Sequence, residues 1–334
     1  MDDGVAAPLD PGLAPLLLFD HTPEESDDGG ASSSSRRLVY SVPKRQLLAA
    51  AGLGCLTGTG ANWVTPQGWV LTLDAATRAA SLRDPFSSRT VRLPPDQDGL
   101  LASSNDTRCF LSTHRPTDPG CVVLLVHFTE PVLCYCRPGD TDTRWFRHEY
   151  QPELLVVDDR YPRDSIISAM SDLTAVGGVF YTEWDDKVAT LQFLQEPTLS
   201  TSQVIDEAWR TSYHFVMHDC LVESCEELFK VRFGYALLCK YKISRVEVHK
   251  LDRSRGTWVK VRGLGPRAFF ISARQFGVSI LANKFGLKAN CIYFTDSDDK
   301  GLYIYNMEQG TTTLHNPGAD IPNSMQPILL LPAA

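Results

Sequence analysis

Two groups of residues in this sequence have spacings that resemble metal-binding sites. The acidic run DSDDKG, residues 296–301, looks like the start of a calcium loop, but Lys300 and Met307 stand where such a loop needs an oxygen ligand and a bidentate glutamate. The H-x3-H-x-C run at residues 214–220 would suit a metal on a helix, whereas this segment leads into a predicted strand and no second pair with zinc spacing lies nearby. We therefore predict a hairpin turn at the first run, no metal site and no cofactor.

Motifs for catalysis are also missing from the sequence. It contains no G-x-S-x-G nucleophile elbow and no P-loop. Gly58 and Gly60 lack the third glycine and the following helix of a dinucleotide-binding fingerprint. We therefore predict no catalytic residues and a chain that is not an enzyme.

A local excess of positive charge is the best candidate for a binding site. Ten Lys and Arg residues lie between residues 240 and 274, against two acidic ones. A basic surface of this kind suits an acidic peptide or a phosphoprotein, and the alternative is that these are solvated positions on exposed strands. Trp258 is nearly alone as an interleaved aromatic residue, so nucleic acid is not expected as a partner. The candidate partner-binding residues are Lys250, Arg253, Arg255, Lys260 and Arg262.

Composition limits the class of protein that can present such a surface. The chain has 334 residues, a net charge of −8 and a pI near 5.5, which does not favour nucleic acid or an anionic membrane as a general partner. Its apolar runs are strand-sized, so no membrane span is expected. The acidic start MDDG does not resemble a secretory signal, and nine cysteines, an odd number, fit a reducing compartment. We expect an intracellular protein, cytoplasmic or nuclear.

The elements that would position these residues are short strands in repeated units. Extended runs joined by polar turns recur from residues 68–94, 120–150, 177–194, 221–272 and 290–315. Repeats of several strands each, starting roughly 50 to 60 residues apart, indicate a β-propeller, because a two-stranded ribbon must stack on copies of itself. We predict an all-β, kelch-like β-propeller of six or seven blades.

Two segments depart from this strand pattern. Residues 200–209 combine a capping signal with an apolar stripe at helical spacing, which predicts a short helix between blades. Residues 1–36 are rich in Asp, Gly, Pro and Ser and are predicted to be a flexible leader, followed by a propeller domain at 37–334. Within the leader, the apolar piece at residues 15–19 could instead add a strand that closes the ring.

The order of the motifs resembles the plant KIB-type β-propeller family, whose domain often follows an F-box. The resemblance covers most of residues 37–315. It rests on GWVLTLD…RDPFSSRTVRLPP at 68–95, LVES at 221–224, VEVHKLD…AFFIS at 246–272, LKANCIYFTD at 287–296 and LYIYNMEQG at 302–310.

The resemblance implies a propeller that binds another protein. Members of the family with an F-box resemble substrate adaptors of cullin-type ubiquitin ligases, in which the propeller holds the target. Residues 1–36 are too short and too rich in Ser, Gly and Pro to form an F-box, so a link to a Skp-type adaptor and a cullin stays open. Two alternatives also stay open: an enzyme or small-molecule binder with its site in the central channel, and a propeller that has lost its F-box and its role.

Overall fold

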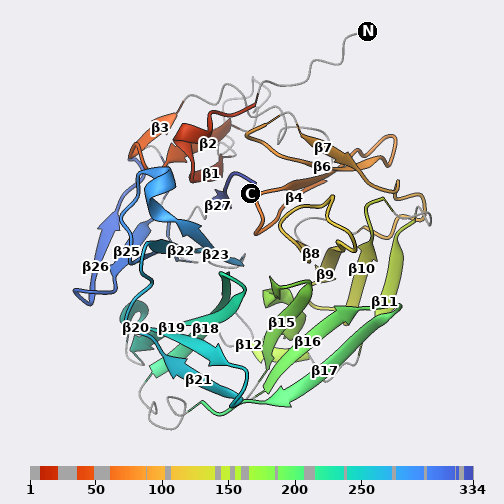
Figure 1. Ribbon diagram of the computed structural model, residues 1–334. Coiled ribbons are helices and arrows are strands. Elements are labelled where there is room, and N and C mark those ends of the chain that lie inside the picture. The colour runs from red at the N-terminus through yellow and green to blue at the C-terminus, as the bar shows by residue number, and fades with distance from the viewer. Residues whose placement is uncertain are drawn as a thin grey trace.

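The computed structural model of the protein describes residues 8–21, 36–48, 61–87, 89–101, 107–139, 144–150, 155–158, 165–184, 187–206, 215–236, 239–272, 276–296, 299–319, 321–322 and 327–333. In this part of the chain, six β-sheets are arranged as the blades of a ring (Figure 1). The predicted β-propeller is therefore confirmed, and the number of blades is six. The described residues include no helix that is both long and apolar enough to cross a membrane.

Each blade is a sheet that runs from the ring axis to the rim. From the inside outward, the closing blade consists of β27 (Ile328–Leu330), β1 (Leu16–His21), β2 (Arg36–Ser41) and β3 (Gln46–Leu48). In the same direction, the second blade consists of β4 (Ala61–Val64), β5 (Val70–Leu73), β6 (Ala80–Arg83) and β7 (Thr90–Arg92). The third consists of β8 (Thr107–Leu111), β9 (Val123–His127), β10 (Val132–Cys136) and β11 (Phe146–Glu149).

The remaining three blades complete the ring. The fourth consists of β14 (Thr174–Val176), β15 (Val179–Trp184), β16 (Lys187–Phe193) and β17 (Pro197–Gln203). The fifth consists of β18 (Phe215–Ser224), β19 (Glu227–Ala236), β20 (Cys239–Asp252) and β21 (Thr257–Lys260). The sixth has five strands, β23 (Phe276–Leu281), β22 (Arg267–Ser272), β24 (Cys291–Thr295), β25 (Leu302–Asn306) and β26 (Thr311–His315).

The ring is closed by strands from both ends of the chain. Leu17 of β1 lies opposite Leu329 of β27 on one side and Tyr40 of β2 on the other, and both pairings are antiparallel. The residues of β1 fall within the predicted leader, and they form the closing strand that the apolar piece at 15–19 suggests as an alternative. The ring thus includes residues on both sides of the predicted boundary at residue 36. The other leader residues, apart from 8–15 and Arg36 of β2, lie outside the described part.

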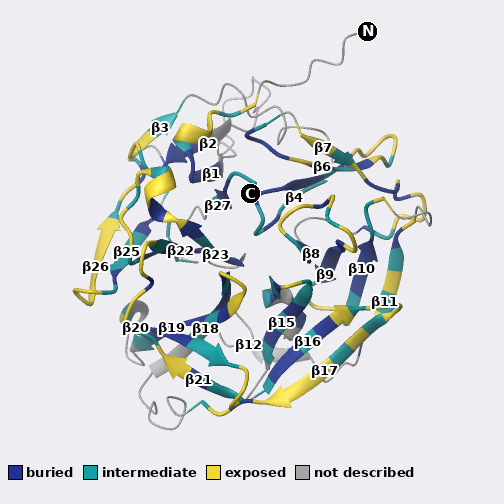
Figure 2. Ribbon diagram, in the orientation of Figure 1, coloured by how far each residue is buried: buried dark blue, intermediate teal, exposed yellow. Residues whose placement is uncertain are grey.

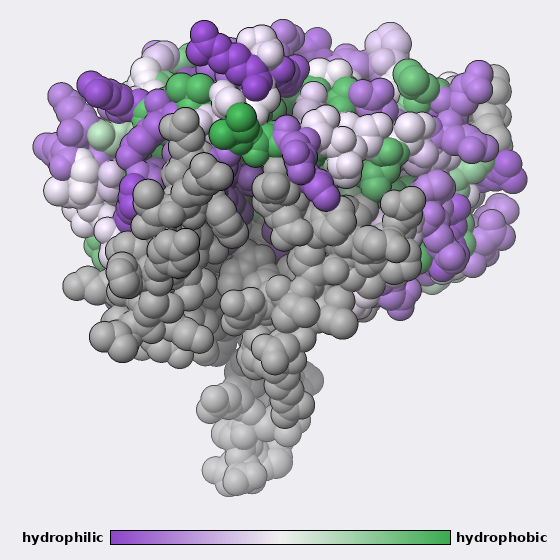
Figure 3. Space-filling view, turned by 90° about the horizontal axis from the view of Figure 1, so that it is seen from below, coloured by the Kyte–Doolittle hydropathy of each residue, from purple (hydrophilic) through white to green (hydrophobic). Residues whose placement is uncertain are grey.

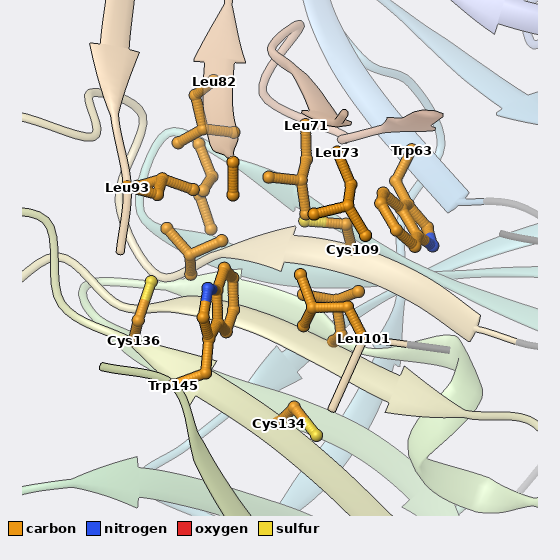
Figure 4. Close-up of a cluster of buried hydrophobic side chains, with 14 of the residues drawn as sticks. Trp63, Leu71, Leu73, Leu82, Leu93, Leu101, Cys109, Cys134, Cys136 and Trp145 are labelled. Carbon is orange, nitrogen blue, oxygen red and sulfur yellow. The ribbon is translucent and has the colours of Figure 1, made fainter. Parts of the chain in front are cut away.

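Neighbouring blades pack face to face, which explains why inner strands are apolar on both faces. Strand β9, with the sequence VLLVH, is buried over its first four residues, because each face of its blade meets another blade. On one side, Leu125 and Cys136 join a cluster with Leu71 and Trp145 (Figure 4). Burial decreases from the inner strands to the rim (Figure 2), where β17 and β26 are largely exposed.

The sixth blade differs in strand topology from the other five blades. Strands β22 and β24 run parallel, and the connection between them passes through β23 and the short 3-10 helix η6 (Ala282–Phe285). A parallel pair needs such a crossover. Strand β23 consequently forms the inner edge and runs beside β18 of the fifth blade, where Gly277 would bring a Cβ within 2.7 Å of the Leu221 carbonyl oxygen.

The elements outside the blades are small. The helix η1 (Pro11–Leu13) precedes β1 and begins at Asp10, whose side chain accepts a hydrogen bond from the amide of Gly12. Strands β12 (Leu155–Asp158) and β13 (Ser165–Ser168) form a separate antiparallel ribbon, and η4 (Ala169–Asp172) connects this ribbon to β14. Each of the helices described is therefore a single short 3-10 turn.

The helix predicted over residues 200–209 is wrong in its described part. Residues up to Gln203 belong to β17, which pairs with β16 along its whole length from Phe193↔Pro197 to Lys187↔Gln203. The β-branched Thr residues of PTLSTSQ favour a strand, and seven paired residues outweigh the apolar spacing that suggests a helix. Ile205 then forms a bridge to Thr257 of the next blade. Residues 207–210 lie outside the described part.

Candidate functional site

The five predicted binding residues are spread over the outer half of the fifth blade. Lys250 lies on β20 opposite Phe229, whereas Lys260 of β21 lies opposite His249, so their side chains leave opposite faces of the sheet. Arg253 and Arg255 lie on the turn between β20 and β21, and Arg262 is exposed beyond β21. The structure therefore does not bring these five residues together as one patch.

Four of the five have a partner within the blade or the blade before it. Three make ion pairs: Lys250 with Glu227 at 3.0 Å, Arg255 with Asp252 at 3.8 Å, and Lys260 with Glu247. The guanidinium of Arg253 lies 5.3 Å from the ring centre of Tyr181 in the fourth blade. Arg262 makes no ion pair with any residue in the described ranges.

Behind this outer half lies a group of buried and partly buried charges, which we call the interblade cluster: Glu183, Asp206, Asp219, Lys230 and Arg232. It forms because every second residue of β19 faces the fourth blade. Lys230 and Arg232 alternate with Val231. The side chain of Val231 therefore points to the other face of the sheet, where it packs in an apolar cluster with residues of the sixth blade. Both cations are almost completely buried, at 0 % and 1 % exposed.

Three carboxylates surround the two cations. Lys230 Nζ lies 2.7 Å from Glu183 Oε1 and 2.6 Å from Asp206 Oδ2, and 4.4 Å from the ring centre of Trp258. Arg232 contacts Asp206 at 2.8 Å and Asp219 at 2.6 Å through Nη2, and its Nε donates to Asp219 Oδ1 at 2.8 Å. Asp206 bridges both cations, so a residue shortly after β17 is tied to the second strand of the next blade.

Two of the three acids of the cluster have pKa values that are shifted in opposite directions. Burial, followed by the nearby charge of Asp219, raises the pKa of Glu183 to about 7, against the lowering effect of Lys230. Burial also opposes ionisation of Asp206, but its hydrogen bonds and charge interactions with Lys230 and Arg232 outweigh that effect and lower its pKa to about 2. Near neutral pH, Asp206 is thus a fixed anion of the cluster, whereas Glu183 can change charge.

Glu247 and His249 extend the polar layer along β20. Both are buried, and Glu247 Oε1 accepts hydrogen bonds from Arg245 and Lys260. Burial raises and these two cations lower the pKa of Glu247, with a net lowering, while burial and the charge of Arg232 lower the pKa of His249. Buried atoms without a hydrogen-bond partner among the described residues include Glu183 Oε2, Glu247 Oε2, His249 Nδ1 and Trp258 Nε1.

A second polar group, which we call the axial cluster, lies at the inner ends of three blades: His114, Glu223, Ser224, Arg267 and Ser279. His114 is on the β8–β9 loop and its Nε2 lies 3.6 Å from Glu223 Oε2 of β18. The hydroxyls of Ser224 and Ser279 are 2.9 Å apart, and Arg267 Nε donates to Ser279 Oγ at 2.6 Å. Segments up to 165 residues apart in the chain therefore meet near the ring axis, where β8, β18 and β23 lie (Figure 1).

The tip of the β18–β19 hairpin belongs to this region. Its two turn residues, Cys225 and Glu226, both have positive φ, 55° and 64°, and both are exposed. The amide of Glu226 donates to Glu223 Oε1 at 2.8 Å. The side-chain interaction with the Glu223 carboxylate raises the pKa of His114, and although burial opposes it, the interaction with His114 lowers the pKa of Glu223. These shifts favour a charged pair beside an exposed, conformationally unusual turn.

Sequence reasoning locates these residues without recognising their roles. The LVES and VEVHKLD motifs contain Glu223, Ser224, Glu247 and His249, which the sequence pattern predicts only as strand positions. The alternation in LFKVRFG, residues 228–234, contains the signal for the buried cations, because Lys and Arg occupy one face of a strand whose other face is apolar. Nothing in the sequence pairs His114 with Glu223.

The two rejected metal groups have structural roles. Asp299 caps its turn by accepting from the amide of Gly301 at 2.6 Å, and Lys300 is buried, with Nζ donating to the Gly318 carbonyl at 2.7 Å. His218 and Cys220 lie on β18, while His214 is outside the described residues. Among the residues described, no three His, Cys, Asp or Glu side chains are placed to hold a metal ion.

The fold and these sites define a six-bladed β-propeller closed by both ends of its chain. The KIB1-4 beta-propeller family model matches residues 39–306, and the chain belongs to this family. It is 25% identical over 270 residues to a putative F-box protein of Arabidopsis thaliana, covering 77% of this chain and 68% of that protein.

Solved structures similar to the chain include two bacterial proteins. One is a functionally unknown protein from Desulfotomaculum acetoxidans, with 10% identity, a TM-score of 0.38 and coverage of 89% of this chain and 82% of that chain. The other is the periplasmic gluconolactonase PpgL of Pseudomonas aeruginosa, with 12% identity, a TM-score of 0.35 and coverage of 94% and 99%. Likeness at this level does not bear on function.

Proposed function

We propose that this chain is a non-enzymatic module that binds another protein, and that its role lies in ubiquitin-dependent turnover. Membership of a propeller family associated with F-box proteins supports the first part, and the similarity to a putative F-box protein supports the second. The face that carries the axial cluster is the proposed contact surface.

The observation that carries this proposal is the meeting of three blades at the axial cluster. Residues on a loop (His114) and on strands (Glu223, Arg267) reach one place and are fixed by one another. Exposed side chains beside them, Arg115 and Glu226, offer charges of both signs on a rigid base. A partner gains most from contacts that are ordered before binding, because less conformational freedom is lost.

Affinity purification with matched variants tests the proposal. The tagged chain is expressed in plant cells under proteasome inhibition, and captured proteins are identified by mass spectrometry. An axial variant carries Arg115→Ala and Glu226→Ala, and a control variant carries Arg92→Ala and Glu196→Ala, which remove one charge of each sign from other exposed positions. We expect at least one protein captured by the wild type and the control to be lost from the axial variant.

Two results would contradict this proposal in different ways. Failure of the wild type to capture any specific protein removes the binding role, and equal capture by both variants removes the axial face as the contact surface. Recovery of a Skp-type adaptor and a cullin would support the turnover role. Recovery of a partner without them would leave a stand-alone binding module.

A further inference from the structure

Four basic side chains form a second charged surface, at the junction between the closing blade and the sixth blade. This junction patch consists of Lys44, Arg45, Lys284 and Lys288. All four are exposed. None makes an ion pair with a residue in the described ranges, in contrast to Lys250, Arg255 and Lys260 of the fifth blade.

Direct packing of the two blades brings the four residues near one another. Lys44 and Arg45 lie on the β2–β3 turn, and Lys284 and Lys288 lie on and after η6. The segments on both sides share one apolar cluster, in which Tyr40 and Leu47 of the closing blade meet Phe285 and Tyr293 of the sixth. Figure 1 shows η6 beside the closing blade.

Tyr293 lies between the two halves of the patch. Its hydroxyl accepts a hydrogen bond from the amide of Lys288 at 3.0 Å, and Arg45 is close enough to affect the pKa of Tyr293, which burial raises. Three residues on the turns that carry the patch adopt left-handed backbone conformations: Arg45 with φ 53°, Gly286 with φ 62° and Asn290 with φ 57°. The basic side chains therefore project from fixed turns.

The patch lies on the same face of the ring as the axial cluster. Strand β23 runs in the direction of β18, because Gly277 lies against Leu221 while Ser279 meets Ser224 further along. The helix η6 begins where β23 ends, at Leu281. The helix η6 therefore leaves the sixth blade on the face of the ring where β18 enters the turn at Cys225.

The junction patch is a basic surface on a chain whose net charge is −8. Elsewhere on the blades, carboxylates of the chain itself neutralise many exposed cations, as Glu227 does for Lys250 and Asp84 for Arg89. Lys and Arg on fixed turns suit carboxylates, which Arg can bind through two parallel hydrogen bonds. Figure 3, which views the molecule from below the orientation of Figure 1, shows a described surface that is mostly hydrophilic, with separate apolar side chains.

We propose that the junction patch binds a carboxylate-rich, acidic segment of the partner protein. This inference rests on the proposed protein-binding function and adds the chemistry of the partner. The axial cluster would hold the body of the partner, and the junction patch, on the same face, would hold the acidic segment. Such contacts raise the rate of association and weaken as salt is added.

Binding of a defined acidic peptide tests the inference directly. The probe is a fluorescein-labelled octaglutamate peptide, with octaglutamine as the uncharged comparison, followed by fluorescence anisotropy with the full chain at two salt concentrations. The patch variant carries Lys44→Gln, Arg45→Asn, Lys284→Gln and Lys288→Gln, where Asn tolerates the left-handed backbone of Arg45. The control variant loses the same charge elsewhere through Arg83→Gln, Arg92→Gln, Arg144→Gln and Arg147→Gln, at exposed positions on or beside strands of the second and third blades.

We expect salt-sensitive binding of octaglutamate to the wild type, weaker by about tenfold or more in the patch variant and within about twofold in the control variant. Absence of binding to the wild type, or equal loss in both variants, would overturn the inference. Binding to phosphatidylserine vesicles in place of the peptide would also overturn it and would assign the patch to a membrane surface. Circular dichroism of each variant confirms that the ring is intact.

The purification experiment separates this inference from the proposed function. A partner captured equally by the wild type and the patch variant would refute the acidic-segment site and leave the protein-binding role intact. Absence of any partner with the wild type would refute the protein-binding role itself.

Discussion

At the scale of the residue, Lys230 is a single side chain that compensates the charge of several carboxylates. Its ammonium group is fully buried and lies within ion-pair distance of Glu183, Asp206 and Asp219. Removing one partner from a buried group of charges leaves the others without compensation, which costs more than the original pairing gained. The interblade cluster therefore makes the fourth and fifth blades sensitive to a change at one position.

The first prediction concerns replacement of Lys230 by a side chain of similar length without charge. Lys230→Met is expected to lower the free energy of unfolding by about 3–5 kcal/mol, because three carboxylates lose a buried counter-charge. Lys250→Met is the matched control, since it breaks an exposed pair with Glu227 and should cost at most about 1 kcal/mol. Urea denaturation measures both. Similar small losses in the two variants would refute the importance of the cluster.

The second prediction concerns the pH dependence that Glu183 gives to stability. Its pKa is raised to about 7 in the folded chain, against about 4.3 in the unfolded chain. Between these values the folded state holds a proton that the unfolded state has released, so stability falls as pH rises through this range. Glu183→Gln removes this loss, and the variant should gain about 1–3 kcal/mol relative to the wild type between pH 5 and pH 8.

Comparison with the variant isolates Glu183 from other groups that titrate in the same range. The pKa of His249 is lowered by burial, so His249 makes stability rise with pH, whereas the raised pKa of His114 acts in the opposite direction. Both residues are present in wild type and variant, and their effects cancel in the difference. A difference in unfolding free energy that is constant from pH 5 to pH 8 would contradict the assignment.

Individual residues are partly accessible to sequence reasoning. The alternation of Val246 and Val248 with Glu247 and His249 correctly separates the two faces of β20. It cannot show that both faces are buried, because that depends on the position of the fourth blade. The pairing of His114 with Glu223 depends on a loop that crosses from another blade, which no local pattern encodes.

At the scale of the element, the β18–β19 hairpin has a strained turn. It closes in two residues, with Ser224 opposite Glu227, and both turn residues have positive φ. A two-residue hairpin of this kind normally carries Asn-Gly, because other residues meet a steric cost in the left-handed region. Here Cys225 and Glu226 occupy the turn, beside the axial cluster, so stability is given up where partner binding is proposed.

The third prediction restores the usual residues of this turn. The double substitution Cys225→Asn and Glu226→Gly is expected to raise the free energy of unfolding by about 1 kcal/mol. Ser254→Gly in the β20–β21 turn is the control, since residue 254 is not among those with positive φ and gains nothing from glycine. Thermal unfolding followed by circular dichroism compares the variants. A loss of stability in the double variant would show that the native turn is not strained.

Elements are predicted well where their period is clear and less well at the boundaries between blades. The extended runs predicted within residues 68–94 correspond to β5, β6 and β7. The helix predicted over residues 200–209 is wrong in its described part, because apolar spacing at a rim strand carries little information when one face is solvated. Pairing with β16 decides the structure there, and pairing is not visible in a single segment.

At the scale of the whole molecule, closure of the ring joins parts of the chain that sequence comparison treats separately. The family model begins at residue 39 and ends at 306, so β1 and β27 lie outside the matched range. These two strands nevertheless form the inner half of the closing blade. Leu16 and Leu330 are fully buried there, and a ring without this blade would expose two sheet faces and one open edge.

The last prediction tests whether the C-terminal segment is a structural part of this closure. Gly68 lies on the turn between β4 and β5, with φ +83°, and a Cβ at this position would come within 2.7 Å of Leu331 O and Ala333 N. Gly68→Ala therefore adds a backbone clash to the cost of a positive φ, and should lower the free energy of unfolding by about 2–4 kcal/mol. Gly120→Ala has the same sign of φ, +74°, with nothing within 4 Å of its Cβ, and should cost about 1 kcal/mol.

If the two variants unfold at the same denaturant concentration, the segment after β27 is free to move away from the turn, and closure rests on the pairing of β1 with β27 alone. If Gly68→Ala is the less stable, the segment is held against the second blade, and both chain ends contribute to the rigid ring on which partner binding depends.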